Sequence, residues 1–566
     1  MLRRGLVQTG PPVRLVRSVR LVRSVRLLLP LLLGLPVLLG FAATVAPALH
    51  SGGMSELASW PGLPRAALLS LGTGLGATLA ALVLTLLILA ALTDRPLFRW
   101  VQASLSPLLA IPHAAAALGL AFLIAPSGWI ARLLSPWATG WQQPPDLLIL
   151  NDPYGVTLTL GLVLKELPFL LIVALAALPQ TGAHRRLQVA RSFCYGDIAG
   201  FLLTVVPALY PALRLPVLAV LTYAMTNVDM AQILGPTTPP TLAVQITRWM
   251  TEPALAHGDL AAAAALLQTG LVLVALALWA LGEAAVARTG THLTLHGLRV
   301  LSLDHARPLI AALTATMITV LTLAIASLAL WSIAGLWPFP APLPQNLTLA
   351  AWSHAAPALA ATAATSLLIG VLATVAALTL TLAALQAEHR MAAPPIPPLL
   401  IYLPLIVPQI CFLPGLVAAA LPLGASGGFA SVTAAHLLFV LPYTYLTLSG
   451  PFRAWDARIG TVAATLGAST SRIFWRLRLP MLLAPILTAA AVGLAVSMAQ
   501  YLPTLLVGGG RVSTLTTEAL ALASGGNRRL TSAYGLLQAL LPIAGFLIAA
   551  GLPKWLHHRR FAAGFA

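Results

Sequence analysis

Residues 461–480 read TVAATLGASTSRIFWRLRLP, and residues 188–207 read QVARSFCYGDIAGFLLTVVP. Both stretches are polar loops that lie between long apolar runs. At a spacing of 273 residues Val189 recurs as Val462, Ala190 as Ala463 and Pro207 as Pro480. A loop that recurs at one fixed spacing predicts a chain built from two similar halves.

The same spacing continues without a gap over about 55 residues. The further pairs are Met225 and Met498, Asn227 and Gln500, Gly235 and Gly508, and Thr241-Leu242 and Thr514-Leu515. Apolar composition produces chance matches of Val, Ala and Leu, but it does not easily align a Met, a Gly, a Pro and a Thr-Leu pair. Upstream, Pro112 and Gly119 resemble Pro408 and Gly415 at a spacing of 296.

The composition predicts an integral membrane protein made of helices. Hydrophobic residues make up 59% of the chain and charged residues only 8%, whereas soluble domains carry about 25% charged residues. Apolar runs of about 20 residues are long enough to cross a bilayer. We predict twelve spans, at 27–49, 66–92, 105–125, 155–178, 208–235, 258–282, 308–336, 355–385, 398–422, 430–450, 481–507 and 534–553.

The basic residues predict the orientation of these spans. With the N-terminus inside, the cytoplasmic segments hold 24 of the 32 Lys and Arg residues, as expected for cytoplasmic loops. This placement explains the net charge of +18 without nucleic-acid binding. The Arg-rich start followed by an apolar run has an alternative interpretation, a signal peptide cleaved near Ala46. We interpret it as a retained first helix whose basic arm rests on anionic lipid.

An even number of spans per half gives two halves of parallel orientation around a central pathway. The expected domains are a basic cytoplasmic arm at 1–26, a first half at 27–282, a cytoplasmic linker at 283–307, a second half at 308–553 and a cytoplasmic tail at 554–566. His292 and His296 in the linker could share a helical face as metal ligands, but no third ligand is in register. No metal and no cofactor is expected.

The loop at 461–480 resembles the EAA loop of the binding-protein-dependent ABC importers of type I. In that family a Glu-Ala-Ala stretch is followed by a Gly and, ten to thirteen residues later, by Ile-x-Leu-Pro. The corresponding residues are Thr461, Val462 and Ala463, then Gly467, and finally Leu477 to Pro480. The stretches LYPALRLPVLAVLTY and LGPTTPPTLAV look most similar to the YnjC type within this family, which is related to the iron(III) and thiamine permeases.

The resemblance implies that both loops form coupling helices that dock on a separate ATP-binding subunit, expected as a homodimer. The residues implied in coupling are Gln188, Ala190, Cys194 and Pro207 in the first loop, and Thr461, Ala463, Ala464, Gly467, Leu479 and Pro480 in the second. Cys194 stands where the family has Gly, which puts the turn of the first loop in doubt. The other implied partners are a periplasmic substrate-binding protein and the lipid bilayer, and the implied location is the bacterial inner membrane.

The chain is not expected to be an enzyme. A phosphate loop needs G-x-x-x-x-G-K-[ST], and neither Lys165 nor Lys554 has that context. The main alternative is a secondary transporter of the major facilitator type, because Asp94-Arg95 follows the second span, but the glycine and basic cluster of that family's motif are missing. A membrane-embedded enzyme is a weaker alternative, since His113 and His436 have no supporting motif.

Polar residues inside spans indicate function by default. Asn227 and Gln500 are repeat partners, and Asp229 pairs with Leu502, so this acid breaks the symmetry. We predict that Asn227, Asp229 and Gln500 line the translocation pathway, unless Asp229 pairs with Lys165. The substrate stays open among a metal ion, a thiamine-like cation, a polyamine and an oxyanion.

Overall fold

The computed structural model describes residues 13–50, 52–252, 255–297, 301–391 and 394–563. Within these residues the chain is helical, and the only β pairing is one isolated bridge between Ala334 and Leu347. Ten helices are long and apolar enough to cross a membrane, or twelve if each of two bent helix pairs counts as one span. This agrees with the predicted number. Residues 1–12 of the predicted basic arm lie outside the described residues.

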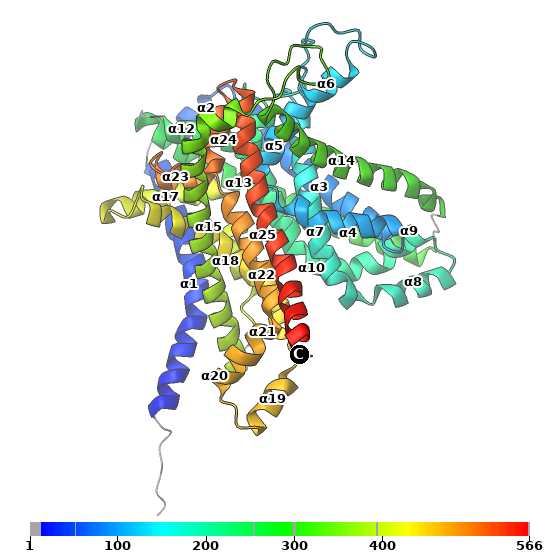
Figure 1. Cartoon of the computed structure of the whole chain (residues 1–566), viewed down its shortest axis with the longest axis vertical. Coiled ribbons are helices and arrows are strands. Elements are labelled where there is room, and N and C mark those ends of the chain that lie inside the picture. The colour runs from blue at the N-terminus through cyan, green and yellow to red at the C-terminus, as the bar shows by residue number, and fades with distance from the viewer. Residues whose placement is uncertain (1–12, 51, 253–254, 298–300, 392–393, 564–566) are drawn as a thin grey trace, which may run out of the picture.

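The helices up to the middle of the chain include long ones with short ones between them (Figure 1). They are α1 (Val13–His50), α2 (Gly53–Ser59), α3 (Leu63–Leu92), α4 (Pro96–Ala110), α5 (His113–Ile124), α6 (Trp129–Leu134), α7 (Val156–Ala177), η1 (Leu178–Thr181), α8 (Ala183–Ser192), α9 (Asp197–Gly200), η2 (Phe201–Val205), α10 (Val206–Thr226), α11 (Asp229–Leu234), α12 (Leu242–Thr251) and α13 (Leu255–Leu295).

The remaining helices begin at residue 301. They are η3 (Leu301–Ala306), α14 (Arg307–Ser332), α15 (Ala350–Arg390), α16 (Pro398–Ile406), α17 (Gln409–Ala420), η4 (Leu421–Leu423), α18 (Phe429–Arg453), α19 (Ala457–Thr465), α20 (Thr470–Ile473), η5 (Phe474–Arg478), α21 (Leu479–Met481), α22 (Leu483–Met498), α23 (Leu502–Gly508), α24 (Leu515–Ala523) and α25 (Arg528–Ala563).

The helix bounds recur at the spacing found in the sequence. Elements α9 and η2 fall on α20 and η5 residue for residue after a shift of 273 positions, and both η2 and η5 are single π-helical turns. Helix α5 falls on α17 after a shift of 296. The backbone therefore repeats even where the side chains differ.

Four predicted spans are broken, a feature that the sequence analysis did not predict. The spans at 105–125 and 398–422 break before Pro112 and Pro408, because proline has no N–H to continue the helix. Helix α10 ends at Thr226 and α22 at Met498, so the spans at 208–235 and 481–507 also break, at Asn227 and around Gln500. The predicted linker loop at 283–307 is mostly helical, since α13 continues to Leu295.

Helices of one half cross those of the other at very small residues. Helix α1 packs along α17, and α14 packs along α5. A Cβ atom on Gly415 of α17 would overlap the backbone oxygen of Gly40 in α1, and one on Gly119 of α5 would lie 2.5 Å from the backbone oxygen of Ala324 in α14. The Thr44 hydroxyl also accepts the Gly415 N–H at 2.8 Å. The matched glycines therefore allow each half to hold the first helix of the other.

We expect Gly415→Val to lower the amount of folded protein, because forced overpacking costs about 1–3 kcal/mol. The matched control is Gly72→Val in α3, where an added Cβ meets nothing within 4 Å. The measurement is the thermal unfolding of purified protein in detergent. Equal melting temperatures for the two variants would contradict the close crossing.

Candidate functional site

Both repeated loops contain the same helix-ending hydrogen bonds. In the first, Tyr195 N–H donates to Ala190 O and Cys194 N–H donates to Arg191 O. In the second, Ala468 N–H donates to Ala463 O and Gly467 N–H donates to Ala464 O. These pairs of bonds define the Schellman motif, which requires a left-handed residue just after the helix. Both loops are therefore two helices joined by one sharp turn.

Cys194 makes the turn that the sequence left in doubt. Its φ is 59°, in the left-handed region, and the φ of Gly467 is 82°. The left-handed conformation costs an ordinary residue about 1–2 kcal/mol, so the first loop keeps the shape of the second at some cost. The missing glycine changes the chemistry of this position but not the course of the backbone.

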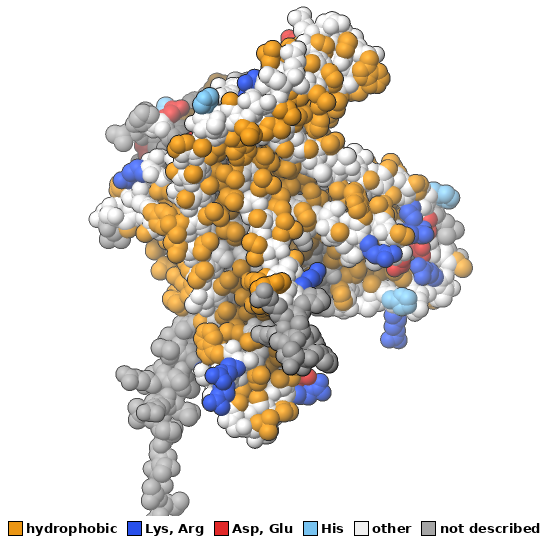
Figure 2. Space-filling view, viewed as in Figure 1, with side chains coloured by type: hydrophobic (Ala, Val, Ile, Leu, Met, Phe, Trp, Pro, Cys, Tyr) orange, Lys and Arg blue, Asp and Glu red, His pale blue; other side chains and the backbone are white. Residues whose placement is uncertain are grey.

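Each loop exposes a pair of apolar side chains four residues apart. In the first loop these are Val189, 51% exposed, and Phe193, 60% exposed; in the second they are Val462, 58% exposed, and Leu466, 82% exposed. The two pairs are repeat partners. In Figure 2 basic side chains surround these regions, at the lower end over α19 and α20 and at the right over α8 and α9. An exposed apolar pair within a basic surface is suited to contact another protein.

The other predicted coupling residues have different surroundings. Gln188, Cys194, Thr461, Ala464 and Gly467 are exposed, Ala463, Leu479 and Pro480 are half-buried, and Ala190 is buried. Ala190 packs closely against Gly200 within the loop, since a Cβ on Gly200 would lie only 3.0 Å from the Cβ of Ala190. Pro207 and Pro480 each follow a π-helical turn, as the second residue of α10 and of α21.

Each loop contains an ion pair between two of its own charged side chains. Arg191 donates to Asp197 at 2.8 Å, and this hydrogen bond raises the pKa of the Arg191 guanidinium above its ordinary value. In the second loop the Asp456 carboxylate accepts the backbone N–H of Arg458 and pairs with its side chain at 2.8 Å. Hydrogen bonds from Arg458 hold the pKa of Asp456 below its ordinary value.

The predicted pathway residues of the first half meet at the break after α10. The Asn227 amide donates to Tyr223 at 2.8 Å and to Asp229 at 2.7 Å. Its oxygen accepts the N–H groups of Met230 and Ala231, so Asn227 caps α11. Asn227 and Asp229 are both buried.

Two residues outside the predicted pathway set, His113 and Glu166, extend this cluster. The ring of Tyr223 lies 4.8 Å from the ring of His113, and His113 pairs with Glu166 at 3.2 Å. A polar chain of neighbouring side chains thus runs from Glu166 to Asp229, in which His113 and Tyr223 are joined by a ring contact and the other members by hydrogen bonds. His113 could have been found from Pro112, because a polar residue directly after a helix break is exposed to the bundle interior.

Lys165 does not pair with Asp229. Its ammonium donates to the backbone oxygens of Leu108 at 3.0 Å and Ile111 at 2.6 Å. The Leu108 oxygen would normally accept the N–H of residue 112, which is a proline and has none. Lys165 therefore satisfies carbonyls at the end of α4, where a cation is favourable. Its role in the described structure is to stabilise the break.

Gln500 lies at the corresponding break of the second half, between α22 and α23. Its side chain is half-buried, and the next residue, Tyr501, donates its hydroxyl to Gln232 of α11 at 3.4 Å. The breaks in the two halves are thus joined by a side-chain contact. Asn227 and Asp229 lie at the start of α11, and Gln500 precedes the tyrosine that reaches this helix; the two acids Glu166 and Asp229 both belong to the first half.

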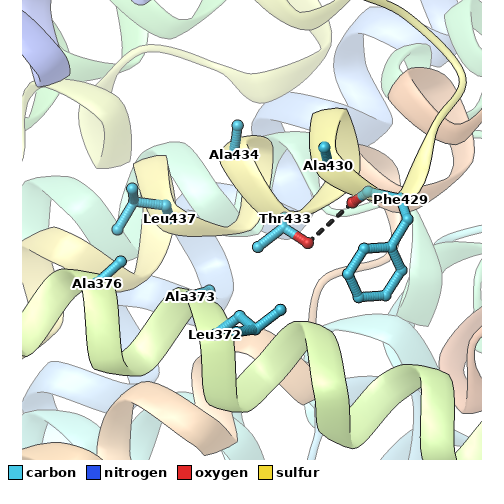
Figure 3. A pocket seen from close by; sticks show the side chains of 8 residues that line it. All are labelled: Leu372, Ala373, Ala376, Phe429, Ala430, Thr433, Ala434 and Leu437. Atoms are coloured by element: carbon cyan, nitrogen blue, oxygen red, sulfur yellow. Dashed lines mark hydrogen bonds between the residues drawn. The ribbon is translucent and has the colours of Figure 1, made fainter.

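A groove elsewhere has the wrong chemistry for a polar solute. It lies between α15 and α18, has a volume of about 450 Å³, and is lined by Leu372, Ala373, Ala376, Phe429, Ala430, Thr433, Ala434 and Leu437 (Figure 3). Its one polar side chain, Thr433, donates to the backbone oxygen of Phe429 at 2.9 Å. The groove offers no polar group to a solute.

Comparison with known proteins agrees with the sequence interpretation. The family model of the binding-protein-dependent transport system inner membrane component matches residues 396–561. The inner membrane ABC transporter permease protein YnjC of Escherichia coli is 32% identical over 520 residues, 91% of this chain and 93% of the relative.

Two shorter relatives match smaller parts of this chain. The molybdenum transport system permease protein ModB of Mycobacterium bovis is 30% identical over 167 residues, 27% of this chain and 62% of the relative. The spermidine/putrescine transport system permease protein PotC of Haemophilus influenzae is 25% identical over 145 residues, 26% of this chain and 56% of the relative.

These matches favour an ABC permease over a transporter of the major facilitator type. The long relative covers both copies of the repeated loop, and the described helices provide ten to twelve membrane spans. The chain belongs to the family of binding-protein-dependent transport system inner membrane components, the multi-pass permease subunits of ABC transporters.

Proposed function

We propose that the chain moves a small solute from a periplasmic substrate-binding protein into the cytoplasm of a bacterium, across the inner membrane. The two halves are residues 27–282 and 308–553. Power comes from a separate ATP-binding subunit that docks on the loops α8–α9 and α19–α20. The observation that carries this proposal is the recurrence of one Schellman turn with one exposed apolar pair in both loops.

The likeness of the two loops supports a homodimeric ATPase. Val189 and Phe193 of one loop correspond in position and exposure to Val462 and Leu466 of the other. Two similar docking surfaces on one chain can each bind the same groove on two identical ATP-binding subunits. The relatives of this chain are named as transport permeases, which agrees with a translocating subunit that works with other proteins.

The direct test is transport by the complex reconstituted in proteoliposomes with its ATP-binding and substrate-binding proteins. We expect uptake to require ATP on the cytoplasmic side and the binding protein on the other. Dissipating the proton gradient with an uncoupler should leave uptake unchanged. Uptake that proceeds without ATP and stops with the uncoupler would refute the proposal.

The turn of the second loop gives a test of docking. An added Cβ on Gly467 meets nothing within 4 Å in the chain itself, so a bulky side chain there affects a docked partner and, through the φ of 82°, adds strain of about 1–2 kcal/mol to the turn. Gly467→Trp should insert normally but bind the ATPase weakly, and Cys194→Trp should be milder because that position already carries a side chain. Co-purification of the ATP-binding subunit measures the effect.

Strain is separated from docking by Gly467→Asn, because Asn tolerates the left-handed region. This variant keeps the turn while adding volume, so it should also weaken binding. Full binding and uptake in Gly467→Trp would exclude this loop as the docking surface.

We also propose that Asn227, Asp229 and Gln500 face the translocation pathway and that the solute is a cation. The names of the relatives do not decide the kind of solute, since one is named for molybdenum and another for spermidine and putrescine. Asp229 and Glu166 add negative charge to one side of the junction between the halves. Charged residues inside a membrane usually serve the transported solute.

Asp229→Asn should lower uptake of a cationic solute while ATPase binding and protein level persist. Gln500→Ala should do the same, and its side chain caps no helix. Asn227→Ala also removes a cap worth about 1 kcal/mol, so its protein level must be measured. We would test labelled spermidine and molybdate in the same proteoliposomes. Unchanged uptake in all three variants would assign these residues to helix packing alone.

A further inference from the structure

The first docking loop is held by a residue that lies more than 100 positions away in sequence. The carboxylate of Asp304, in η3, accepts the backbone N–H of Asp197 through Oδ2 and that of Ile198 through Oδ1, each at 3.0 Å. These N–H groups open the continuous helix from Asp197 to Thr226. The first N–H groups of a helix have no partner within it, so Asp304 supplies the cap from outside the loop.

The second docking loop supplies its own cap at the equivalent place. Ser469 accepts the N–H of Arg472 through its hydroxyl oxygen at 3.3 Å. Its repeat partner, 273 positions earlier, is Gly196. The backbone of the two residues is nearly the same, with φ −67° and ψ 155° for Ser469 and φ −63° and ψ 161° for Gly196. The first loop therefore has the geometry for a serine cap but lacks the side chain.

Gly196 leaves space for the carboxylate of Asp304. A Cβ on Gly196 would lie 2.5 Å from Oδ2 of Asp304 and 3.1 Å from its Cγ. A local cap and the cap from Asp304 therefore exclude each other. The sequence difference between Gly196 and Ser469 is explained by which segment provides the cap.

Ion pairs extend this contact to the start of α14. Arg307 pairs with Asp197 at 3.0 Å and with Asp304 at 3.5 Å, and Asp197 pairs with Arg191 of α8. The repeat partners of Arg191 and Asp197 are Ala464 and Thr470, which carry no charge. The four charged side chains are between 23% and 48% exposed, so the pairs themselves add little stability and serve mainly to fix geometry.

Helix α14 leads from this contact to the intramembrane cluster. It begins at Arg307, directly after η3, and its Ala324 packs against Gly119 of α5. Helix α5 begins at His113, which belongs to the polar chain that ends at Asp229. A displacement of the first docking loop can thus be passed to the pathway through packed groups.

We propose that the segment joining the two halves is a coupling element, in which Asp304 is a positioning residue that ties the first ATPase-docking loop to α14. The proposal rests on the proposed docking function of α8–α9. The second loop has its own cap, and its Asp456–Arg458 pair lies within the loop. The two loops therefore transmit ATPase movement unequally, the first through Asp304 and α14 as well as through α10.

The test compares four forms of the full complex in proteoliposomes: wild type, Asp304→Ala, Gly196→Ser, and the double variant. Asp304→Ala removes both the cap and the tie. The double variant restores a local cap of the Ser469 type but not the tie. We expect uptake per ATP hydrolysed to fall at least about fivefold in Asp304→Ala, the lower end of coupling between distant sites, and to stay low in the double variant although its thermal stability recovers.

Gly196→Ser alone should behave like the double variant, because its side chain displaces Asp304. A matched comparison is Asp456→Ala, which removes a carboxylate cap from the second loop without cutting a tie to another helix; its loss of uptake should be smaller. Recovery of uptake in the double variant, or equal losses in Asp304→Ala and Asp456→Ala, would reduce Asp304 to a local cap and overturn the proposal.

Failure of the docking function itself is recognised separately by co-purification of the ATPase. If the wild-type loops do not bind the ATP-binding subunit, the proposed function fails. If binding persists in every variant while uptake follows the restored cap, only the role of Asp304 as a coupling element fails.

Discussion

Backbone groups that are freed inside a membrane must find partners within the protein, and this constraint governs the whole structure. Lipid offers no hydrogen bonds, so an interrupted helix is tolerated only where other groups satisfy it. Lys165 does this for α4 by donating to Leu108 O and Ile111 O. Asn227 does it for α11 by accepting two N–H groups. Some polar side chains inside the spans therefore serve to satisfy the backbone groups at helix breaks.

Polar and ionisable side chains in the membrane lie close to the helix breaks. His113 begins the helix after one break and Asp229 the helix after another, and Tyr223 and Asn227 join them. In the second half the corresponding break before Pro408 has no lysine nearby on α18, since position 438, 273 residues after Lys165, is a leucine. Several helices of the two halves correspond in position, but the lysine that stabilises this break is present only in the first half.

The same asymmetry appears at the cytoplasmic loops. Cys194 and Gly467 make the same turn, yet the first loop takes its cap from Asp304 and the second from Ser469. Because the two halves are joined in one chain, Asp304 in the joining segment can cap a helix of the first half. The two loops thus differ in how they are held although their turns have the same hydrogen bonds.

The sequence by itself determined the class, the number of spans and the repeat. Hydropathy, the spacing of 273 residues and the Gly467–Pro480 pattern are local or periodic signals, so they can be read along the chain. It did not place the break at Asn227, where no proline stands; near Gln500 the available signal was Pro503 in the first turn of α23. It also left open whether Lys165 faces Asp229, since both lie inside spans and the partner of a buried charge depends on how helices pack. Only the tertiary structure assigned Lys165 to the α4 carbonyls, joined His113 to Glu166, and brought Asp304 to a helix more than 100 residues earlier. Such contacts are decided by helix crossings at Gly119 and Gly415, where the shape of two surfaces, rather than any pattern along one, sets which groups meet.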